Sequence, residues 1–377
     1  MKSSKGQRDW SEGLPLWLRA PLLLRPDNFT PLTRTPWGGQ VIGERYKREL
    51  VPAARGQHIG ESWEFSCDPA FPSRFVPNQG PEGELLALIE RYPEAILSPE
   101  LVRAKGVSCE ILLKLLDAAE PLSLQVHPAD GDRFLTPDEC GKPESWLILA
   151  AAPGAGIYLG FSRTVSRDDL RLVLNDGDKA KELLNFVPVK PGDFFSIEPG
   201  VTHAIGAGVT VLEPQRILTG KTGKTYRLWD WGRRYDKNGQ LDQVHGQPRA
   251  LHVEASLQLI DPQRQVGAAY VDTLRRLPRI STLAGGISVR EFPANPYYKT
   301  LLCAQPVGTE LRLSIEGGYG ALLMLSGRVS VLGKTLMAGQ PCLLPHYAMP
   351  LTFKADVSSE FAVLAPASAT IGCTDVR

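Results

Sequence analysis

ILLKLLDAAEPLSLQVHPADGDRFLTPDECGKPESWLILA, residues 111–150, is the stretch that decides the fold. Its segment 122–127 alternates apolar and polar residues without a break, which is typical of a β-strand. In such a strand the apolar residues at 122, 124 and 126 share one face, while Ser123, Gln125 and His127 share the other. Neighbouring polar side chains that point into a protein interior each need a partner, and a metal ion with a polar ligand would provide it.

A second strand, predicted over 144–149, brings two more polar side chains. Lys142 and Glu144 stand two positions apart, so they are expected on the same face of the chain. Glutamine, histidine and glutamate on neighbouring strands offer the oxygen and nitrogen ligands of a divalent metal site. Lys142 would place a cation beside that site.

Two motifs in this stretch resemble the type I mannose-6-phosphate isomerases, a family of zinc-dependent cupins. The family pattern L-S-(I/V/L)-Q-V-H-P appears here as LSLQVHP at 122–128. The pattern G-K-(T/P)-E-x-W follows as GKPESW at 141–146. The resemblance covers most of residues 30–255 with specific motifs, and the rest of the chain only by pattern.

The resemblance implies a fourth metal ligand in KPGDFFSIEPGVTH, residues 190–203. In cupins this segment is a hairpin that presents the last ligand, and His203 matches that position. The implied ligand set is Gln125, His127, Glu144 and His203, holding one Zn²⁺ per chain. Two histidines and one carboxylate also suit non-haem Fe(II), so the ligand types alone leave an oxygenase open.

Beyond His203 the chain turns basic, and TYRLWDWGR at 225–233 resembles the family's TYR-x-(Y/W)-D-(Y/W)-G-R. Arg227 matches an arginine of the family's active site. Two positions depart from the pattern. Gly223 stands where the family usually has an aspartate, and fourteen residues separate Glu213 from Arg227 where the family has about ten. Four extra residues therefore lie before Arg227, at the rim of the expected pocket.

The function implied by the resemblance is the interconversion of mannose 6-phosphate and fructose 6-phosphate through a cis-enediol. Arg227 would stabilise developing negative charge, because a guanidinium stays charged and offers paired donors. Lys142 and Ser123 match family active-site positions and could hold the phosphate. The sequence does not identify the base, for which Glu213 is a candidate, although a buried structural carboxylate explains it equally. One alternative is a non-catalytic metal cupin that senses a sugar phosphate, and another is an Fe(II) oxygenase.

Two neighbouring features have structural explanations from the sequence alone. Lys114 lies in the apolar run 111–116, where a lysine either reaches the pocket or extends out to solvent. The segment 59–66, IGESWEFS, resembles a strand of the family, and we expect Trp63 to pack in the core.

The fold class implied is mainly β, with two cupin-type antiparallel β-barrels and appended or inserted helices. We expect a metal-binding domain over residues 1–255 and a second, structural barrel over 256–377, where His346 has no accompanying ligand set. Apolar residues at 85, 88, 89 and 92 predict a helix that ends before Pro93.

The composition limits the classes of partner and the cellular location that we expect. A formal net charge of +1 disfavours nucleic acid or a membrane surface as the main partner. The partner that the resemblance implies is a phosphorylated hexose. The six cysteines are scattered without a CxxC pair, which predicts free thiols and a cytoplasmic location. No run reaches the length of a transmembrane helix. The oligomeric state is not readable from the sequence.

Overall fold

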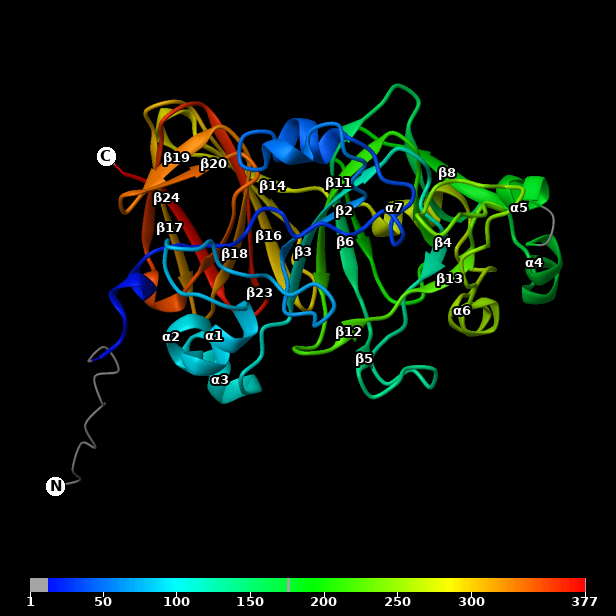
Figure 1. Cartoon of the computed structure of the whole chain (residues 1–377), viewed down its shortest axis with the longest axis horizontal. Helices are drawn as coiled ribbons and strands as arrows, with labels where there is room; N and C mark the ends of the chain where they lie inside the picture. Colours follow the sequence, from blue (N-terminus) through cyan, green and yellow to red (C-terminus); the bar gives the residue numbers. More distant parts are fainter. Residues whose placement is uncertain (1–12, 175–176, 377) are drawn as a thin grey trace.

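The computed structural model describes residues 13–174 and 177–376. Among these residues, four of the five sheets are antiparallel and form two pairs that lie side by side along the long axis of the molecule (Figure 1). The fifth consists of two short parallel strands, β5 (Glu139–Cys140) and β12 (Thr222–Gly223). Each pair encloses its own interior, and the neighbouring sheets of the two pairs pack against each other through a shared apolar core. This architecture confirms the predicted fold class, which is mainly β with antiparallel sheets and appended helices.

The first pair carries the motifs. Its outer sheet has the strand order β13-β4-β10-β7-β8. These strands are Tyr226–Trp229, Leu124–Val126, His203–Ile205, Gly156–Phe161 and Leu184–Pro188. Its inner sheet has the order β2-β3-β11-β6-β9. These strands are Glu61–Phe65, Ile111–Ala118, Val209–Arg216, Glu144–Ala151 and Phe194–Ile197.

The second pair follows in sequence. The sheet beside the first pair has the order β1-β21-β18-β23-β16-β15-β14. These strands are Leu22–Leu23, Pro341–Leu344, Gly320–Ser326, Ser359–Pro366, Tyr298–Gln305, Ser288–Phe292 and Arg279–Thr282. The far sheet has the order β20-β19-β22-β17-β24. These strands are Lys334–Met337, Arg328–Val331, Leu351–Ala355, Glu310–Glu316 and Thr370–Asp375.

The inner sheet of the first pair is covered on both faces, which explains its nearly continuous apolar sequence. In β3, residues 111, 113 and 115 join the core between the two pairs. Residues 112, 114 and 116 point the other way, because alternate side chains of a strand face opposite sides. Lys114 therefore points into the interior of the first pair, where it lines a pocket.

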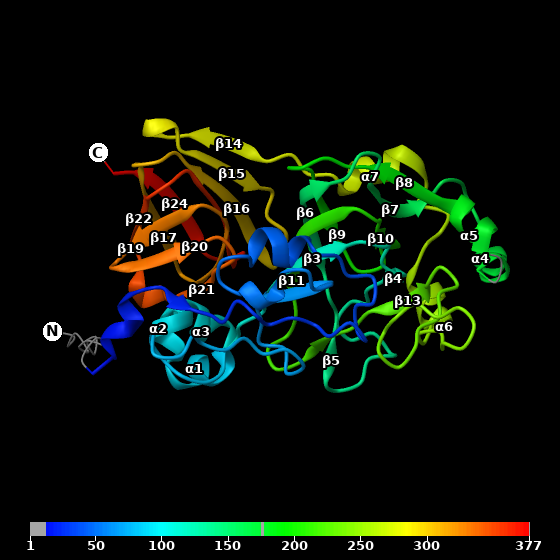
Figure 2. The same ribbon diagram turned by 45° about the horizontal axis from the view of Figure 1, so that its top comes forward.

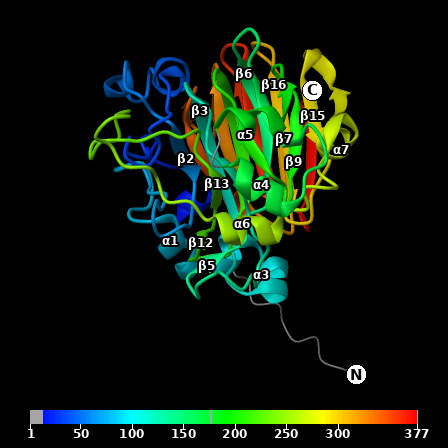
Figure 3. The same cartoon turned by 90° about the vertical axis from the view of Figure 1, so that its right-hand side faces the viewer.

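Helices cover the ends of the sheets. α1 (Leu85–Arg91), α2 (Pro93–Leu97) and α3 (Pro99–Lys105) form a cluster at one edge of the molecule (Figure 2). The break before Pro93 confirms the predicted helix end. α4 (Arg167–Val173), α5 (Gly177–Leu183) and α6 (Val253–Leu259) lie at the opposite end of the long axis (Figure 3). Ser166 caps α4, because its hydroxyl accepts a hydrogen bond from the backbone N–H of Asp169.

The link between the two pairs runs through α6 and α7 (Gly267–Leu274). Ala255 and Leu257 of α6, and Val271 and Leu274 of α7, belong to the cores of the first pair. The boundary after residue 255 stays a prediction. On packing alone, the chain leaves the first pair after α7.

The segment predicted as a hairpin, 190–203, is not one in its strand pairing. β9 pairs with β6 in the inner sheet, whereas β10 pairs with β4 and β7 in the outer sheet. The turn between them carries the chain across the interior, and Gly200 adopts φ +88° there. Its N–H donates to the carbonyl of His127 over 2.9 Å, which ties this turn to the strand motif.

Candidate metal centre and pocket

The site lies between the two sheets of the first pair, and strand register sets its residues in rows. Across the outer sheet, His203 of β10 is paired with Gln125 of β4, and Gln125 is paired with Arg227 of β13. Neighbouring strands are ~4.8 Å apart, so these side chains form a row that leads from His203 to the edge of the sheet. Register therefore gathers residues that are far apart in sequence.

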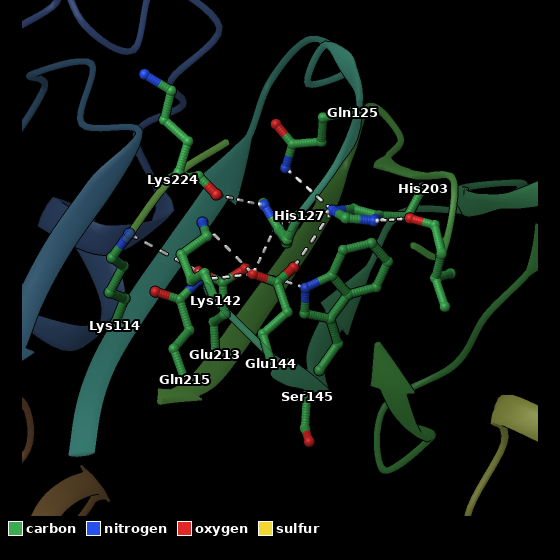
Figure 4. Close-up of polar contacts among 12 residues, drawn as sticks. Lys114, Gln125, His127, Lys142, Glu144, Ser145, His203, Glu213, Gln215 and Lys224 are labelled. Atoms are coloured by element: carbon green, nitrogen blue, oxygen red, sulfur yellow. Dashed lines mark hydrogen bonds and ion pairs between the residues drawn. The ribbon is translucent and has the colours of Figure 1, made fainter. Parts of the chain in front are cut away.

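The inner sheet supplies a facing set. Glu144 of β6 is paired with Gln215 of β11, and Glu213 of β11 is paired with Lys114 of β3. The Gln215 amide nitrogen donates to Glu144 Oε2 and to Glu213 Oε2, each over 2.7 Å. This amide holds the two carboxylates in fixed positions (Figure 4).

Three buried side chains converge as possible metal ligands. Nε2 of His127 lies 3.0 Å from Glu144 Oε2, and Nε2 of His203 lies 3.4 Å from Glu144 Oε1. The two Nε2 atoms are 3.1 Å apart. Within the described residues, no other set of three His, Cys, Asp or Glu side chains brings its ligand atoms together in this way.

The hydrogen bonds of the two rings fix their tautomers. Nδ1 of His127 lies 3.2 Å from the carbonyl of Lys224, and Nδ1 of His203 lies 2.9 Å from the carbonyl of Val201. A carbonyl can only accept, so each Nδ1 carries the proton and each Nε2 presents a lone pair. Two lone pairs that face each other beside a carboxylate are satisfied by a cation, which is the arrangement of a metal-ligating histidine pair.

The ionisation states agree with metal ligation. Burial lowers the pKa of His127 to about 3 and also lowers the pKa of His203, so both rings are neutral. Burial works against ionisation of Glu144, but its pKa lies well below the usual range, and the ammonium of Lys142 is the charged neighbour that favours the carboxylate. Glu144 Oε1 is buried without a hydrogen-bond partner among the described residues. The donor set therefore fits a divalent cation.

Gln125 stands at the same place in the outer sheet. Its amide Nε2 lies 3.2 Å from Nε2 of His203. A half-turn of the amide would exchange its nitrogen and oxygen, and the oxygen is the atom that a cation would use. Ser123, two residues earlier, donates to the Gln125 oxygen over 3.4 Å and lines the pocket.

Lys142 reaches the ligands from the rim. It is 8% exposed, and its Nζ lies 3.5 Å from Glu144 Oε2. Its stem packs on Gly223, where a Cβ would stand 2.9 Å from Lys142 Cδ and 2.7 Å from Ile217 Cγ2. An aspartate at position 223 would thus collide with Lys142 and Ile217, which gives a steric reason for this departure from the family pattern.

Glu213 combines burial with access to the pocket. Trp146 Nε1 donates to Glu213 Oε1 over 3.0 Å, and Gln215 holds the other oxygen. Burial, followed by the charge of Glu144, raises the pKa of Glu213 to about 8. Such a carboxyl is a candidate acid–base group.

A pocket of about 410 Å³ opens over these residues. Its walls contain the predicted site residues Ser123, Gln125, Lys142, Glu213 and Arg227. Four further charged side chains also line the pocket, which are Arg34, Glu61, Lys114 and Arg249. Lys114 is 4% exposed, and its Nζ lies 3.4 Å from Glu61 Oε2 and 4.0 Å from Glu213 Oε2, so it reaches the pocket.

Arg227 lies on the pocket wall, half-buried at the end of the outer-sheet row. Its Nη1 donates to the carbonyl of Ala250 over 2.7 Å, while Nε is buried without a partner within residues 13–174 and 177–376. Burial, followed by the charge of Arg249, lowers the pKa of Arg227 to about 10. The side chain is thus a cation with donor capacity left for a ligand.

Comparison with known proteins matches residues 31–145 to the catalytic domain of type I phosphomannose isomerase. A mannose-6-phosphate isomerase from Streptococcus mutans is 35% identical over 225 residues, which are 59% of this chain and 64% of the relative. Mannose-6-phosphate isomerase ManA from Bacillus subtilis is 32% identical over 226 residues, 60% of this chain and 64% of the relative. The chain thus covers less than two thirds of these relatives.

Solved structures extend the similarity to nearly the whole chain. The crystal structure of a Bacillus subtilis mannose 6-phosphate isomerase matches with a TM-score of 0.73 and 25% identity, covering 92% of this chain and 99% of that one. A putative mannosephosphate isomerase from Archaeoglobus fulgidus, 22% identical with a TM-score of 0.66, shares the fold. The segment that matches the catalytic domain of type I phosphomannose isomerase contains both His127 and Glu144.

Proposed function

We propose that this protein interconverts mannose 6-phosphate and fructose 6-phosphate. The observation that carries the proposal is the pocket itself, where a buried two-histidine and one-carboxylate set adjoins cations and a carboxyl with a raised pKa. A metal site, an acid–base group and positive charge are the components that isomerisation of a sugar phosphate requires.

The proposed cofactor is one Zn²⁺ per chain, held by His127, Glu144 and His203 with the amide oxygen of Gln125. When bound, a divalent cation would polarise the carbonyl and hydroxyl oxygens at C1 and C2 of the sugar. Lys142, 3.5 Å from Glu144, lies where it can donate to the same oxygens.

Glu213 is the proposed base. As a carboxylate it would take the proton from C2 and return it to C1, while the hydroxyl proton moves from O2 to O1. The intermediate cis-enediol presents both carbons to one side, so a single carboxylate can serve both steps. Trp146 and Gln215 fix the orientation of Glu213, which keeps it in place for the transfer.

Arg227 is the proposed stabiliser of the charge that develops on the enediolate. Its Nε is buried and has no partner among the described residues, so it would supply a donor that is less screened than one in bulk water. Ser123 would contribute a hydroxyl to substrate binding.

The rival functions make different use of the same pocket. An Fe(II) oxygenase with an apolar substrate is disfavoured by the cations on the pocket wall, which are Arg34, Lys114, Lys142, Arg227 and Arg249. A non-catalytic sensor of sugar phosphate would bind the same ligand without turnover. The proposed partner is a phosphorylated hexose, and a cytoplasmic location stays a prediction. Among the described helices, none combines the length and apolar character that crossing a bilayer requires.

A coupled assay tests the proposal. The zinc-loaded protein is incubated with mannose 6-phosphate, and fructose 6-phosphate is followed through glucose-6-phosphate isomerase and an NADP-linked dehydrogenase. We expect turnover with mannose 6-phosphate, loss on chelation and recovery on adding zinc. Binding of mannose 6-phosphate by calorimetry with no turnover under any metal would reject the isomerase in favour of the sensor.

A further inference from the structure

The charges in the pocket are distributed unevenly. At one end, each lysine faces a carboxylate: Lys114 pairs with Glu61, and Lys142 with Glu144. Arg34 also lines this end, where it lies over the ring of Trp63. At the other end stand Arg227 and Arg249, both on the pocket wall. Within the described residues, Arg227 has no carboxylate partner, and Arg249 shares Asp230 with a second arginine, Arg233. This arginine end, defined as Arg227 and Arg249, therefore carries excess positive charge.

The carboxylate of Asp230 fixes the position of the Arg249 side chain. Its Nε donates to Asp230 Oδ2 over 2.8 Å, and its Nη2 donates to Oδ1 over 2.6 Å. Arg233 Nη2 donates to the same Oδ1 over 2.7 Å, and the Asp230 side chain is 6% exposed. The fork leaves Nη1 of Arg249 available to a ligand. A guanidinium fixed in this way binds an anion with a smaller loss of side-chain freedom.

The arginine end is separated from the metal-ligand set by neighbouring strands of the outer sheet. His203, Gln125 and Arg227 occupy successive strands, and β13, which carries Arg227, is the edge strand of its sheet. Arg227 Nη1 contacts the carbonyl of Ala250, the neighbour of Arg249. A path from the histidines thus passes Gln125 and Arg227 before it reaches Arg249. A hexose 6-phosphate likewise carries its phosphate at the opposite end from C1 and C2.

We propose that Arg249, anchored by Asp230 and standing beside Arg227, binds the phosphate of the substrate. The ligand class is a phosphomonoester dianion, which suits the paired donors of a guanidinium. This assignment rests on the proposed isomerase for the sugar, but its phosphate chemistry can be tested without turnover. It leaves Lys142, which is paired with Glu144, to the reacting end of the sugar.

The test measures binding of inorganic phosphate to the zinc-loaded protein by calorimetry. Arg249→Gln should weaken phosphate at least tenfold while the metal content stays that of wild type. Arg249→Lys, which keeps the charge but not the fork, should weaken it less. The matched control is Arg264→Gln, which removes the same charge from an arginine whose side chain is 88% exposed and outside the pocket lining. It should bind phosphate as wild type does.

Steady-state kinetics supply the second reading. Arg249→Gln should raise KM for mannose 6-phosphate by about tenfold or more and leave kcat within a few-fold, because the phosphate is remote from the reacting carbons. Asp230→Asn, which loosens the anchor but keeps Arg249, should raise KM by a smaller factor and serves if Arg249→Gln does not fold.

Two outcomes are decisive. Unchanged phosphate affinity in folded Arg249→Gln, with affinity lost in Lys142→Met, would overturn the assignment in favour of the lysine end. Loss of phosphate binding in Arg249→Gln, in a protein that turns over no sugar phosphate, would reject the isomerase but support the phosphate subsite. These outcomes separate a failure of the phosphate subsite from a failure of the proposed isomerase activity.

Discussion

The two sheet pairs share an architecture but differ in what fills their interiors. In the second pair, the strands point apolar side chains such as Leu311, Met324, Phe353 and Phe361 toward one another. In the first pair, the equivalent space is apolar only in part. Elsewhere it holds the half-buried Gln125 and buried polar side chains, which are Lys114, His127, Glu144, His203, Glu213 and Gln215.

This difference separates a core from a site. Buried polar groups cost free energy unless they are paired, and Gln215 pairs two of the carboxylates. Glu144 Oε1 has no hydrogen-bond partner among the described residues, and the Nε2 atoms of the two histidines face each other beside it, so a metal would satisfy all three. The second pair has an interior that needs no ligand. The contrast predicts that chemistry depends on the first interior and stability on both.

The largest effect is expected from the ligand carboxylate. Glu144→Gln should lower kcat/KM by about 10⁴-fold, or ~5.4 kcal/mol of transition-state stabilisation, because the buried metal loses its anionic ligand. Met324→Leu is the matched change in the second interior, where a swap of similar volume should leave kcat/KM unchanged. Equal losses in the two variants would show that activity follows general stability and would break the comparison.

The next effect concerns the base. Glu213→Gln should reduce kcat by roughly 10³-fold with little change in KM or metal content. A base acts in its ionised form, so wild-type kcat/KM should fall as the pH decreases through the pKa of Glu213. That pKa is raised to about 8, and a bound cation would shift the acidic limb of the pH profile to lower pH. A pH profile of Glu213→Gln that keeps this limb would assign the titration to another group.

A smaller effect is expected at Arg227. Arg227→Lys should lower kcat by ~10–100-fold while metal stays bound, because an ammonium cannot reproduce the planar fork. If Arg227 serves only to attract phosphate, KM should rise instead, and added salt should mimic part of the loss. Kinetics at two ionic strengths separate these cases, and unchanged kcat and KM would remove Arg227 from the site.

The smallest effect is expected in the second pair. His346 is partly exposed and lies outside the three-residue ligand set. His346→Ala should leave kcat/KM within a few-fold of wild type, measured on protein whose thermal transition is checked in parallel. A thousandfold loss in a folded variant would show that the second pair contributes to catalysis.

The sequence was most informative where a motif fixed both residue type and spacing. The strand of Gln125 and His127, the pair Lys142 and Glu144, and the later His203 were all proposed as site residues from such motifs. The structure brings them together, because the register of β4, β6 and β10 converts that spacing into proximity. The same pattern gave the mainly β fold class.

Other residues left no comparable signal. The strand that contains Lys114 is apolar on both faces, because both faces of its sheet are buried. The pattern of apolar and polar residues therefore could not predict the direction in which the lysine points. The one available hint was an acidic residue in the predicted strand 59–66, because Glu61 of that strand is the ion-pair partner of Lys114. Arg249 lies in a loop with no periodicity. The crossing of the chain from β9 in the inner sheet to β10 in the outer sheet was not predicted either. The sequence of a tight turn is the same whether or not the strands on its two sides pair with each other.

The most direct test of the account is metal stoichiometry. We predict about one zinc per chain in the wild-type protein and in His346→Ala, and less than a tenth of that in His127→Ala and His203→Ala, by elemental analysis of folded protein. That result would place the metal in the interior of the first sheet pair. Full zinc in both His127→Ala and His203→Ala would contradict the central claim.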